Sequence, residues 1–114
     1  MEKIVRQTLL FDLYSELLTE HQREIYEDVI LGDIGYSEVA EREGVSRQSV
    51  HDLVKRTERQ LEEYEQKLML LDKLVRIRSQ AEQIRCLASQ AADGTADINP
   101  EKLIRIADEI LEEL

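Results

Sequence analysis

The side chains best suited to bind a ligand gather in residues 42–59, where cationic and amide groups recur at helical spacing. Arg and Gln can contact guanine or adenine in bidentate fashion, whereas Arg and Lys also contact phosphates. These residue types predict a nucleic-acid interface. The candidates for base edges are Arg47, Gln48, His51, Asp52 and Lys55, and the candidates for phosphates are Arg42, Lys55, Arg56 and Arg59.

Catalytic chemistry finds little support in the same sequence. His21 and His51 have no Cys or carboxylate at metal-ligand spacing around them. Cys86 lies in an apolar helical pattern, which favours a packing role over a nucleophilic one. No glycine-rich phosphate loop is present. We therefore expect a binding protein without catalytic residues, metal or cofactor.

A helix-turn-helix over about residues 36–56 is expected to position the candidate residues. Ala40 supplies a small side chain where two helices approach, and Gly44, four residues later, suits a left-handed turn. Ser37 and Ser46 are expected to cap the two helices. The inward side chains would be Val39, Val45, Val50 and Leu53.

Helical periodicity continues on both sides of this motif, so we expect an all-α fold. A first helix is predicted over about residues 2–17. Thr19 and Gln22 predict a capping box at the start of a second helix, and Gly32 is expected to end it in the left-handed conformation.

A long helical stretch begins at Arg47, because no Gly or Pro follows until Gly94. It predicts either one very long helix or two abutting helices. A one-residue offset between its two apolar seams indicates either a bend near Leu71-Asp72 or a partner on a different face. The apolar residues of this stretch past residue 60 would either pack against other helices of the same chain or form the contact of a homodimer. We favour the homodimer. The dimer seam would be Leu61, Tyr64, Leu68, Leu71 and Val75.

A C-terminal amphipathic helix is expected to start with Asn99 as N-cap and Pro100 as its first residue. We divide the chain into a helix-turn-helix domain, residues 1–60, and a helical extension, residues 61–114, that is not an independent domain. One apolar face of the last helix is predicted to consist of Leu103, Ala107, Ile110 and Leu114.

The formal net charge of −10 argues against broad, charge-driven binding of nucleic acid. Residues 1–35 carry three basic and eight acidic side chains and residues 93–114 carry two and seven, whereas residues 36–92 are neutral. The middle can therefore still present a positive face. No apolar run is long enough to span a bilayer, no signal peptide is apparent and one cysteine cannot form an internal disulfide, so we expect a cytoplasmic protein.

Three stretches resemble region 4 of bacterial sigma factors, which is a helix-turn-helix domain. They are residues 17–23 (LLTEHQR), 36–41 (YSEVAE) and 45–50 (VSRQSV). The resemblance implies a sigma region 4-like helical bundle, here extended by the long helix and the C-terminal helix.

Further matches narrow the resemblance to the YlxM family of small bacterial proteins. They lie at Leu13-Tyr14 and at residues 55–58 (KRTE), 61–65 (LEEYE) and 67–68 (KL), so that the resemblance covers about residues 9–70. It implies a regulatory or DNA-binding protein linked to the signal recognition particle pathway, because genes of this family typically lie beside those for the particle's GTPase or its receptor. The residues that match the family's recognition helix are Arg47, Gln48, Lys55 and Arg56.

Two functions stay open at this point. The second helix of the motif could read DNA, although His51 departs from the aromatic residue expected there. Alternatively, the protein is an adaptor whose acidic ends meet a basic partner, and it modulates the signal recognition particle GTPase or its RNA–protein complex without binding DNA.

Overall fold

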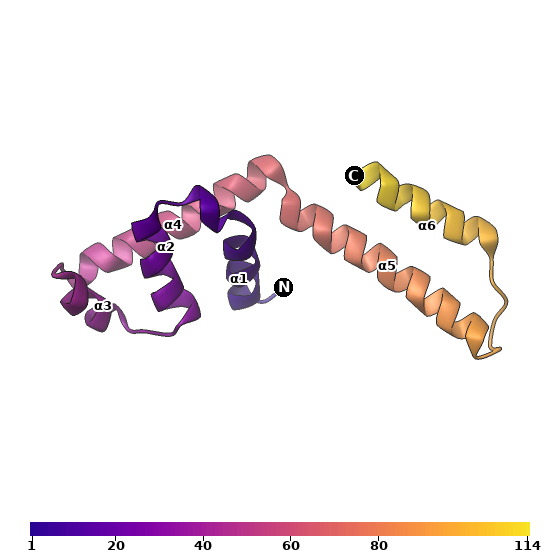
Figure 1. Cartoon of the computed structure of the whole chain (residues 1–114), viewed down its shortest axis with the longest axis horizontal. Helices are drawn as coiled ribbons and strands as arrows, with labels where there is room; N and C mark the ends of the chain where they lie inside the picture. Colours follow the sequence, from indigo (N-terminus) through magenta and orange to yellow (C-terminus); the bar gives the residue numbers. More distant parts are fainter. The chain divides into compact units, whose positions relative to one another are not determined.

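The computed structural model describes residues 1–114 and contains helices only (Figure 1), which confirms the all-α prediction. The chain divides into two compact units, Met1–Leu71 (unit 1) and Asp72–Leu114 (unit 2). None of the helices combines the length and hydropathy that a membrane span requires. The elements are α1 (Lys3–Tyr14), the 3₁₀ turn η1 (Ser15–Leu17), α2 (Glu20–Tyr26), the π-helical segment η2 (Glu27–Leu31), α3 (Tyr36–Glu43), α4 (Arg47–Leu68), α5 (Leu70–Ala92) and α6 (Pro100–Glu113).

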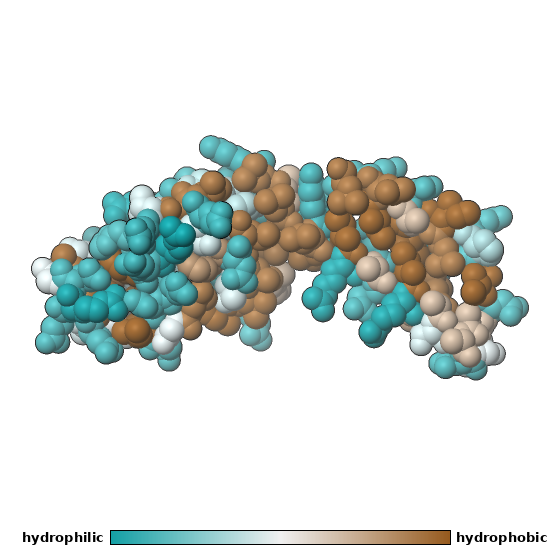
Figure 2. All heavy atoms as spheres, in the orientation of Figure 1, coloured by the Kyte–Doolittle hydropathy of each residue, from teal (hydrophilic) through white to brown (hydrophobic).

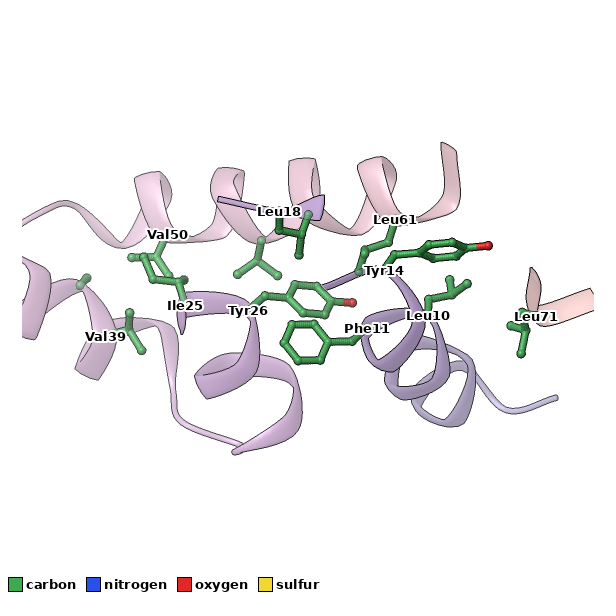
Figure 3. Packing of buried hydrophobic residues seen from close by; sticks show 12 residues of the cluster. Leu10, Phe11, Tyr14, Leu18, Ile25, Tyr26, Val39, Val50, Leu61 and Leu71 are labelled. Atoms are coloured by element: carbon green, nitrogen blue, oxygen red, sulfur yellow. The ribbon is translucent and has the colours of Figure 1, made fainter. Parts of the chain in front are cut away.

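Helix α4 is the central helix of unit 1, because α1, α2 and α3 all pack against it (Figure 1). Its buried positions step by four, three and four residues, the pattern of one helix face turned to a core. The rings of Phe11 and Tyr26 stack at 5.7 Å between centroids in the middle of this core (Figure 3). The core side chains contributed by α4 are Val50, Val54, Thr57 and Leu61.

The predicted capping box at the start of α2 is confirmed. The Thr19 hydroxyl accepts a hydrogen bond from the backbone N–H of Gln22 at 3.2 Å, and the Gln22 side chain accepts one from the N–H of Thr19 at 3.1 Å. This reciprocal pair satisfies amides that the first turn leaves without a helical partner.

The end of this helix differs from the prediction. Gly32 has φ −91°, an ordinary right-handed value, and the next residue, Asp33, takes the left-handed conformation at φ 54°. Gly32 is needed for space, because a Cβ there would lie 2.9 Å from the carbonyl oxygen of Asp28. The backbone approaches so closely because the wide turn of η2 brings the N–H of Gly32 to the carbonyl of Glu27, at 2.8 Å.

The long helical stretch breaks at Met69, two residues before the predicted bend. Met69 is left-handed, with φ 55°, and three polar contacts hold the break. The buried carboxylate of Glu65 accepts hydrogen bonds from the hydroxyl of Tyr14 (2.7 Å) and from the N–H of Leu71 (2.9 Å). The Tyr14 hydroxyl in turn accepts the N–H of Leu70 at 3.2 Å. A carboxylate on α4 and a phenol on α1 thus satisfy the first amides of α5.

Part of the predicted dimer seam is buried within unit 1. Leu61 and Leu71 are buried inside unit 1, and Tyr64 packs against its core, with its ring 6.0 Å from that of Tyr14. This part of the apolar surplus therefore packs within the chain, which is the other alternative that the sequence left open. Leu68 and Val75 are the exposed members of the predicted seam.

Unit 2 is a hairpin in which α6 runs back along α5 (Figure 1). Asn99 caps α6 by accepting the N–H of Lys102 at 3.2 Å, as predicted. The guanidinium of Arg76 donates two 2.8 Å hydrogen bonds to the carboxylate of Glu113 and so joins the open end of the hairpin.

The apolar face predicted for α6 is only partly covered in the structure. Ile106 is its one buried side chain, with Leu103 and Ile110 half-buried beside it, whereas Ala107 and Leu114 are exposed. Apolar residues occupy two adjacent stripes of this helix, so periodicity alone selected a mixture of both stripes.

Candidate nucleic-acid interface

The turn between α3 and α4 has the geometry that the sequence predicted. Gly44 is left-handed, with φ 69° and ψ 32°, and the following N–H of Val45 reaches back to the carbonyl of Ala40 at 3.1 Å. Ala40 is buried where the two helices approach. A left-handed glycine closes the end of α3 without the steric cost that a side chain would add. The turn therefore sets the direction in which α4 leaves.

Ser46 caps α4, as predicted. Its hydroxyl accepts the N–H of Ser49 at 3.0 Å. The first helix is capped differently, because α3 starts at Tyr36 with Gly35 as N-cap, so Ser37 has no capping role. The prediction of inward side chains was right for Val39 and Val50; by contrast, Val45 is half exposed, Leu53 is half-buried, and Val54 takes the inner place.

This burial fixes which side of α4 faces solvent. With Val50 and Val54 turned inward, the opposite side of the first half of the helix is exposed, and Figure 2 shows mostly hydrophilic atoms over this end of unit 1. Five predicted site residues lie on that exposed side: Gln48, Asp52, Lys55, Arg56 and Arg59. Arg47 is also exposed, at the first position of α4, but along the helix it lies in line with the buried Val50 and Val54.

Three of these cations have no acidic partner within the chain: Arg47, Arg56 and Arg59. Lys55 lies 3.5 Å from a carboxylate oxygen of Glu58, a distance at which the pair is easily exchanged in water. Over residues 47–59, α4 carries four basic and two acidic side chains, the reverse of the balance in the whole chain. The first half of α4 is therefore a locally positive surface.

Gln48 and Asp52 interact with each other one turn apart. The Gln48 side-chain amide donates a 2.8 Å hydrogen bond to a carboxylate oxygen of Asp52. An exposed carboxylate in the middle of a positive face repels phosphates and accepts hydrogen bonds from cytosine amino groups. Asp52 can thus make the face selective.

His51 lies differently from the other candidates. Its ring meets that of Tyr36 edge to face, with centroids 5.4 Å apart, and its Nδ1 atom is buried without a hydrogen-bond partner. The side chain is half-buried, and it packs the start of α3 against α4. A shallow depression lined by Tyr36, Arg47, Gln48 and His51 opens beside it.

Arg42 is already engaged inside unit 1. Its guanidinium lies 2.7 Å from a carboxylate oxygen of Asp28, and this hydrogen bond, with a second one to Glu43, raises the pKa of Arg42. The pair ties α3 to η2. Arg42 therefore helps to position α3, and its predicted contact with phosphate would require exchange of this ion pair.

The first helix contributes to the same surface, which the sequence reasoning missed. A groove beside α4 is lined by Lys3, Arg6 and Gln7 of α1 and by residues of α4 from Lys55 to Glu62. The only sequence signal was two basic residues near the start of an otherwise acidic first 35 residues.

The charges of this groove are largely neutralised within it. Arg6 donates two 2.8 Å hydrogen bonds to the carboxylate of Glu62, which lower the pKa of Glu62, and Gln7 donates one of 2.7 Å to Glu58. Lys3 lies 3.8 Å from Glu58. The groove consequently adds little free positive charge to the α4 face.

No three His, Cys, Asp or Glu side chains lie together in a way that could hold a metal ion. Cys86 is exposed on α5, so the packing role that its apolar neighbours predicted is wrong.

Comparison with known proteins agrees with this motif. Residues 1–99 match the family described as "Putative helix-turn-helix protein, YlxM / p13 like". A UPF0122 protein of Shouchella clausii is 45% identical over 93 residues, which cover 81% of this chain and 85% of that protein. UPF0122 proteins of Bacillus cereus and Bacillus anthracis are each 51% identical over 73 residues, covering 64% of this chain and 66% of theirs.

Proposed function

The chain belongs to the YlxM/p13-like family of helix-turn-helix proteins, and from this premise we propose that it is a regulatory protein that binds double-stranded DNA through the first half of α4. The observation that carries the proposal is the set of exposed cations on α4 without an acidic partner: Arg47, Arg56 and Arg59. A helix-turn-helix lays its second helix in the major groove, with its first turns toward base edges.

In this arrangement the residues of α4 divide by their place along the helix. Arg47 and Gln48 occupy the first turn and would face base edges, where each can form two hydrogen bonds with one base. Arg56 and Arg59 lie two to three turns further and would contact phosphates, together with Lys55. Base contacts supply specificity, and phosphate contacts supply affinity and register.

Because the chain is acidic overall, we expect its binding to DNA to depend on a specific DNA sequence. A chain with a net charge of −10 has little non-specific attraction for DNA, so the few uncommitted cations must act together with base contacts. We expect tight binding only to selected sequences and steep weakening with salt.

The test starts from a random duplex library, from which the full-length chain selects its preferred sequence. Binding of a labelled selected duplex is then measured by fluorescence anisotropy from about 50 to 200 mM salt, the range over which counterion release changes affinity most visibly. Arg47→Ala is expected to weaken binding about 5- to 100-fold and to relax the preference at one base pair.

Arg59→Ala is expected to weaken binding to all duplex sequences alike. It should also lower the slope of log affinity against log salt concentration by about one unit. Arg105→Ala is the matched control, because Arg105 is an exposed arginine of α6 without an acidic partner. The proposal fails if selection enriches no sequence, or if Arg105→Ala weakens binding as much as the two α4 variants.

A second candidate function rests on a different surface. Glu16, Glu20, Glu24 and Glu27 follow one another at four, four and three residues along η1, α2 and η2, and all are exposed. None of them has a basic partner within the chain, which suits a basic protein surface. This stripe supports the adaptor alternative, in which the partner is the GTPase of the signal recognition particle or its RNA–protein complex.

The adaptor is tested by capture of that GTPase with and without its RNA. Neutralising Glu20, Glu24 and Glu27 to Gln should abolish capture, while neutralising Glu38, Glu41 and Glu63 should leave it intact, since these three are also exposed carboxylates of unit 1. Equal capture by both triple variants would dismiss the acidic stripe as the contact surface.

A further inference from the structure

Unit 2 has almost no core of its own. Ile106 is the one buried side chain among Asp72–Leu114, and the apolar residues that line the contact between α5 and α6 are only half-buried. Two helices of this size, without a disulfide or a bound metal, seldom bury enough surface to offset the entropy of ordering, and oligomerisation is the usual remedy. The hairpin therefore needs further apolar contacts to be stable.

Helix α6 carries a second apolar stripe that the rest of unit 2 leaves uncovered. Its members recur at three, four and three residues, one position along from the covered stripe of Leu103, Ile106 and Ile110. The exposed fractions reach 60% for Ile104, 66% for Leu111 and 87% for Leu114. A spacing of three and four residues is that of a seam between packed helices. The bare stripe of α6 is Ile104, Ala107, Leu111 and Leu114.

Helix α5 carries a matching bare stripe, formed by Leu74, Ala81 and Ala88 at seven-residue intervals, beside its covered stripe of half-buried Ile77, Ile84 and Ala91. In both helices the bare stripe is turned from the covered stripe by about a quarter turn in the same sense along the sequence. Because the two helices run in opposite directions, these turns bring both bare stripes to the same side of the hairpin. Figure 2 shows hydrophobic atoms spread over both α5 and α6 in this view.

The charges of the two helices identify the partner. Helix α5 carries four basic and two acidic side chains, whereas α6 carries two basic and five acidic ones. Arg78 flanks the bare stripe of α5 on its outer edge, Asp108 flanks that of α6, and neither has an ionic partner within the chain. A second copy, turned by a two-fold rotation parallel to the helices, places its acidic α6 over the basic α5 and its α5 over α6.

We propose that the chain forms a homodimer through unit 2, in which two α5–α6 hairpins join their bare stripes into a four-helix bundle. The small side chains of Ala81 and Ala88 allow the partner's α6 to approach α5 closely. Arg78 of each copy then pairs with Asp108 of the other at the edge of the bundle. This surface differs from the seam of residues 61–75 that periodicity alone favoured.

Sedimentation equilibrium of the full chain tests the proposal. The wild-type protein is expected at twice its chain mass of 13.3 kDa. Leu111→Glu should weaken the dimer about 30-fold or more, the effect of losing a central apolar contact. Arg105→Glu, on the side of α6 turned away from both stripes, is the matched control and should leave the dimer intact.

A charge exchange tests the arrangement of the helices and does not depend on a disruptive apolar variant. Arg78→Asp and Asp108→Arg should each weaken the dimer, and the double variant should restore it. Wild type at 13.3 kDa up to high micromolar concentration overturns the dimer. A dimer that survives Leu111→Glu but is broken by Leu68→Glu, at an exposed leucine of α4, places the contact elsewhere and overturns the proposed surface.

Discussion

The hydroxyl groups of two buried tyrosines in unit 1 have opposite surroundings. Tyr14 donates to the carboxylate of Glu65 at 2.7 Å and accepts the N–H of Leu70. Tyr26 is 0% exposed, and its hydroxyl has no hydrogen-bond partner. Removing a paired hydroxyl from a core costs free energy, whereas removing an unpaired one relieves a desolvation penalty.

We therefore expect two identical substitutions to change stability in opposite directions. Tyr14→Phe should lower the free energy of unfolding by about 1.5–3 kcal/mol, the range for hydrogen bonds to charged groups. Tyr26→Phe should leave it unchanged or raise it by about 1 kcal/mol. Urea unfolding followed by circular dichroism measures both, and a loss of more than about 1 kcal/mol in Tyr26→Phe would show that its hydroxyl is satisfied after all.

The ion pair between Arg6 and Glu62 predicts part of the acid sensitivity of unit 1. Hydrogen bonds from Arg6 lower the pKa of Glu62 below its ordinary 4.5. A carboxylate with a lowered pKa stabilises the fold above its ordinary pKa, and this contribution disappears as the pH falls through the lowered value. The pair is partly exposed and screened, so its contribution is at most about 1 kcal/mol.

Glu62→Gln should remove this dependence. Its free energy of unfolding is expected to lie below that of wild type near neutral pH and to converge with it as the pH falls through the lowered pKa of Glu62. Glu63→Gln, at the exposed neighbouring position, should keep the wild-type profile. Parallel pH profiles of wild type and Glu62→Gln would contradict the assignment.

Helical spacing predicted which side of α4 faces solvent, and hence Gln48 and Lys55, because a single buried face determines the rest of a helix. Arg47 lies in line with the buried Val50 and Val54 and is exposed at the first position of the helix. It could not predict that Arg42 is held by Asp28 or that Arg6 reaches Glu62. The latter residues are 56 positions apart, and their meeting depends on how α1 packs on α4. Only the structure could therefore show which basic side chains have no acidic partner within the chain.

At the scale of the elements, two left-handed residues define the ends of α3 and α4. Gly44 occupies this conformation without strain, whereas Met69 adopts it with a side chain. Met69→Gly should raise the free energy of unfolding by about 0.5–1 kcal/mol, because a left-handed backbone penalises side chains. Gly44→Ala should lower it by about 1–2 kcal/mol, although a Cβ there meets no other atom.

The control for Met69→Gly is Leu68→Gly, one residue earlier in regular helix. This variant should lose up to about 1 kcal/mol, since Leu68 is the last residue of α4, in the right-handed conformation that glycine weakens. Both measurements use urea unfolding of the full chain. If Met69→Gly is as damaging as Leu68→Gly, the break between α4 and α5 is not left-handed in solution.

The same two positions show what element boundaries can be predicted. Gly44 and Ser46 mark the turn by residue type alone, so the helix-turn-helix followed from the sequence. The break at Met69 did not, because methionine disfavours that conformation, and the contacts that hold the break come from Glu65 and Tyr14. Gly32 was misjudged for a similar reason, since the π-helical turn before it decides where the left-handed residue falls.

At the scale of the whole molecule, a dimer would present two copies of α4. Two linked half-sites bind more tightly than one because the second contact is intramolecular. Leu111→Glu, which is expected to be monomeric, should therefore bind the selected duplex at least about tenfold more weakly than wild type. Adding Arg47→Ala to this variant should weaken binding further, by the same factor as in wild type. Unchanged affinity in a verified monomer would show that DNA binding does not require the dimer.

The measurement that tests the central claim most directly is an NMR titration of the ¹⁵N-labelled full chain with the selected duplex. Binding by the first half of α4 predicts that the largest amide shifts fall in residues 44–59, with weaker changes in α1 around Lys3 and none in α2. Shifts concentrated on Glu20 to Glu27, or spread evenly over the chain, would contradict the claim that α4 is the DNA-binding surface.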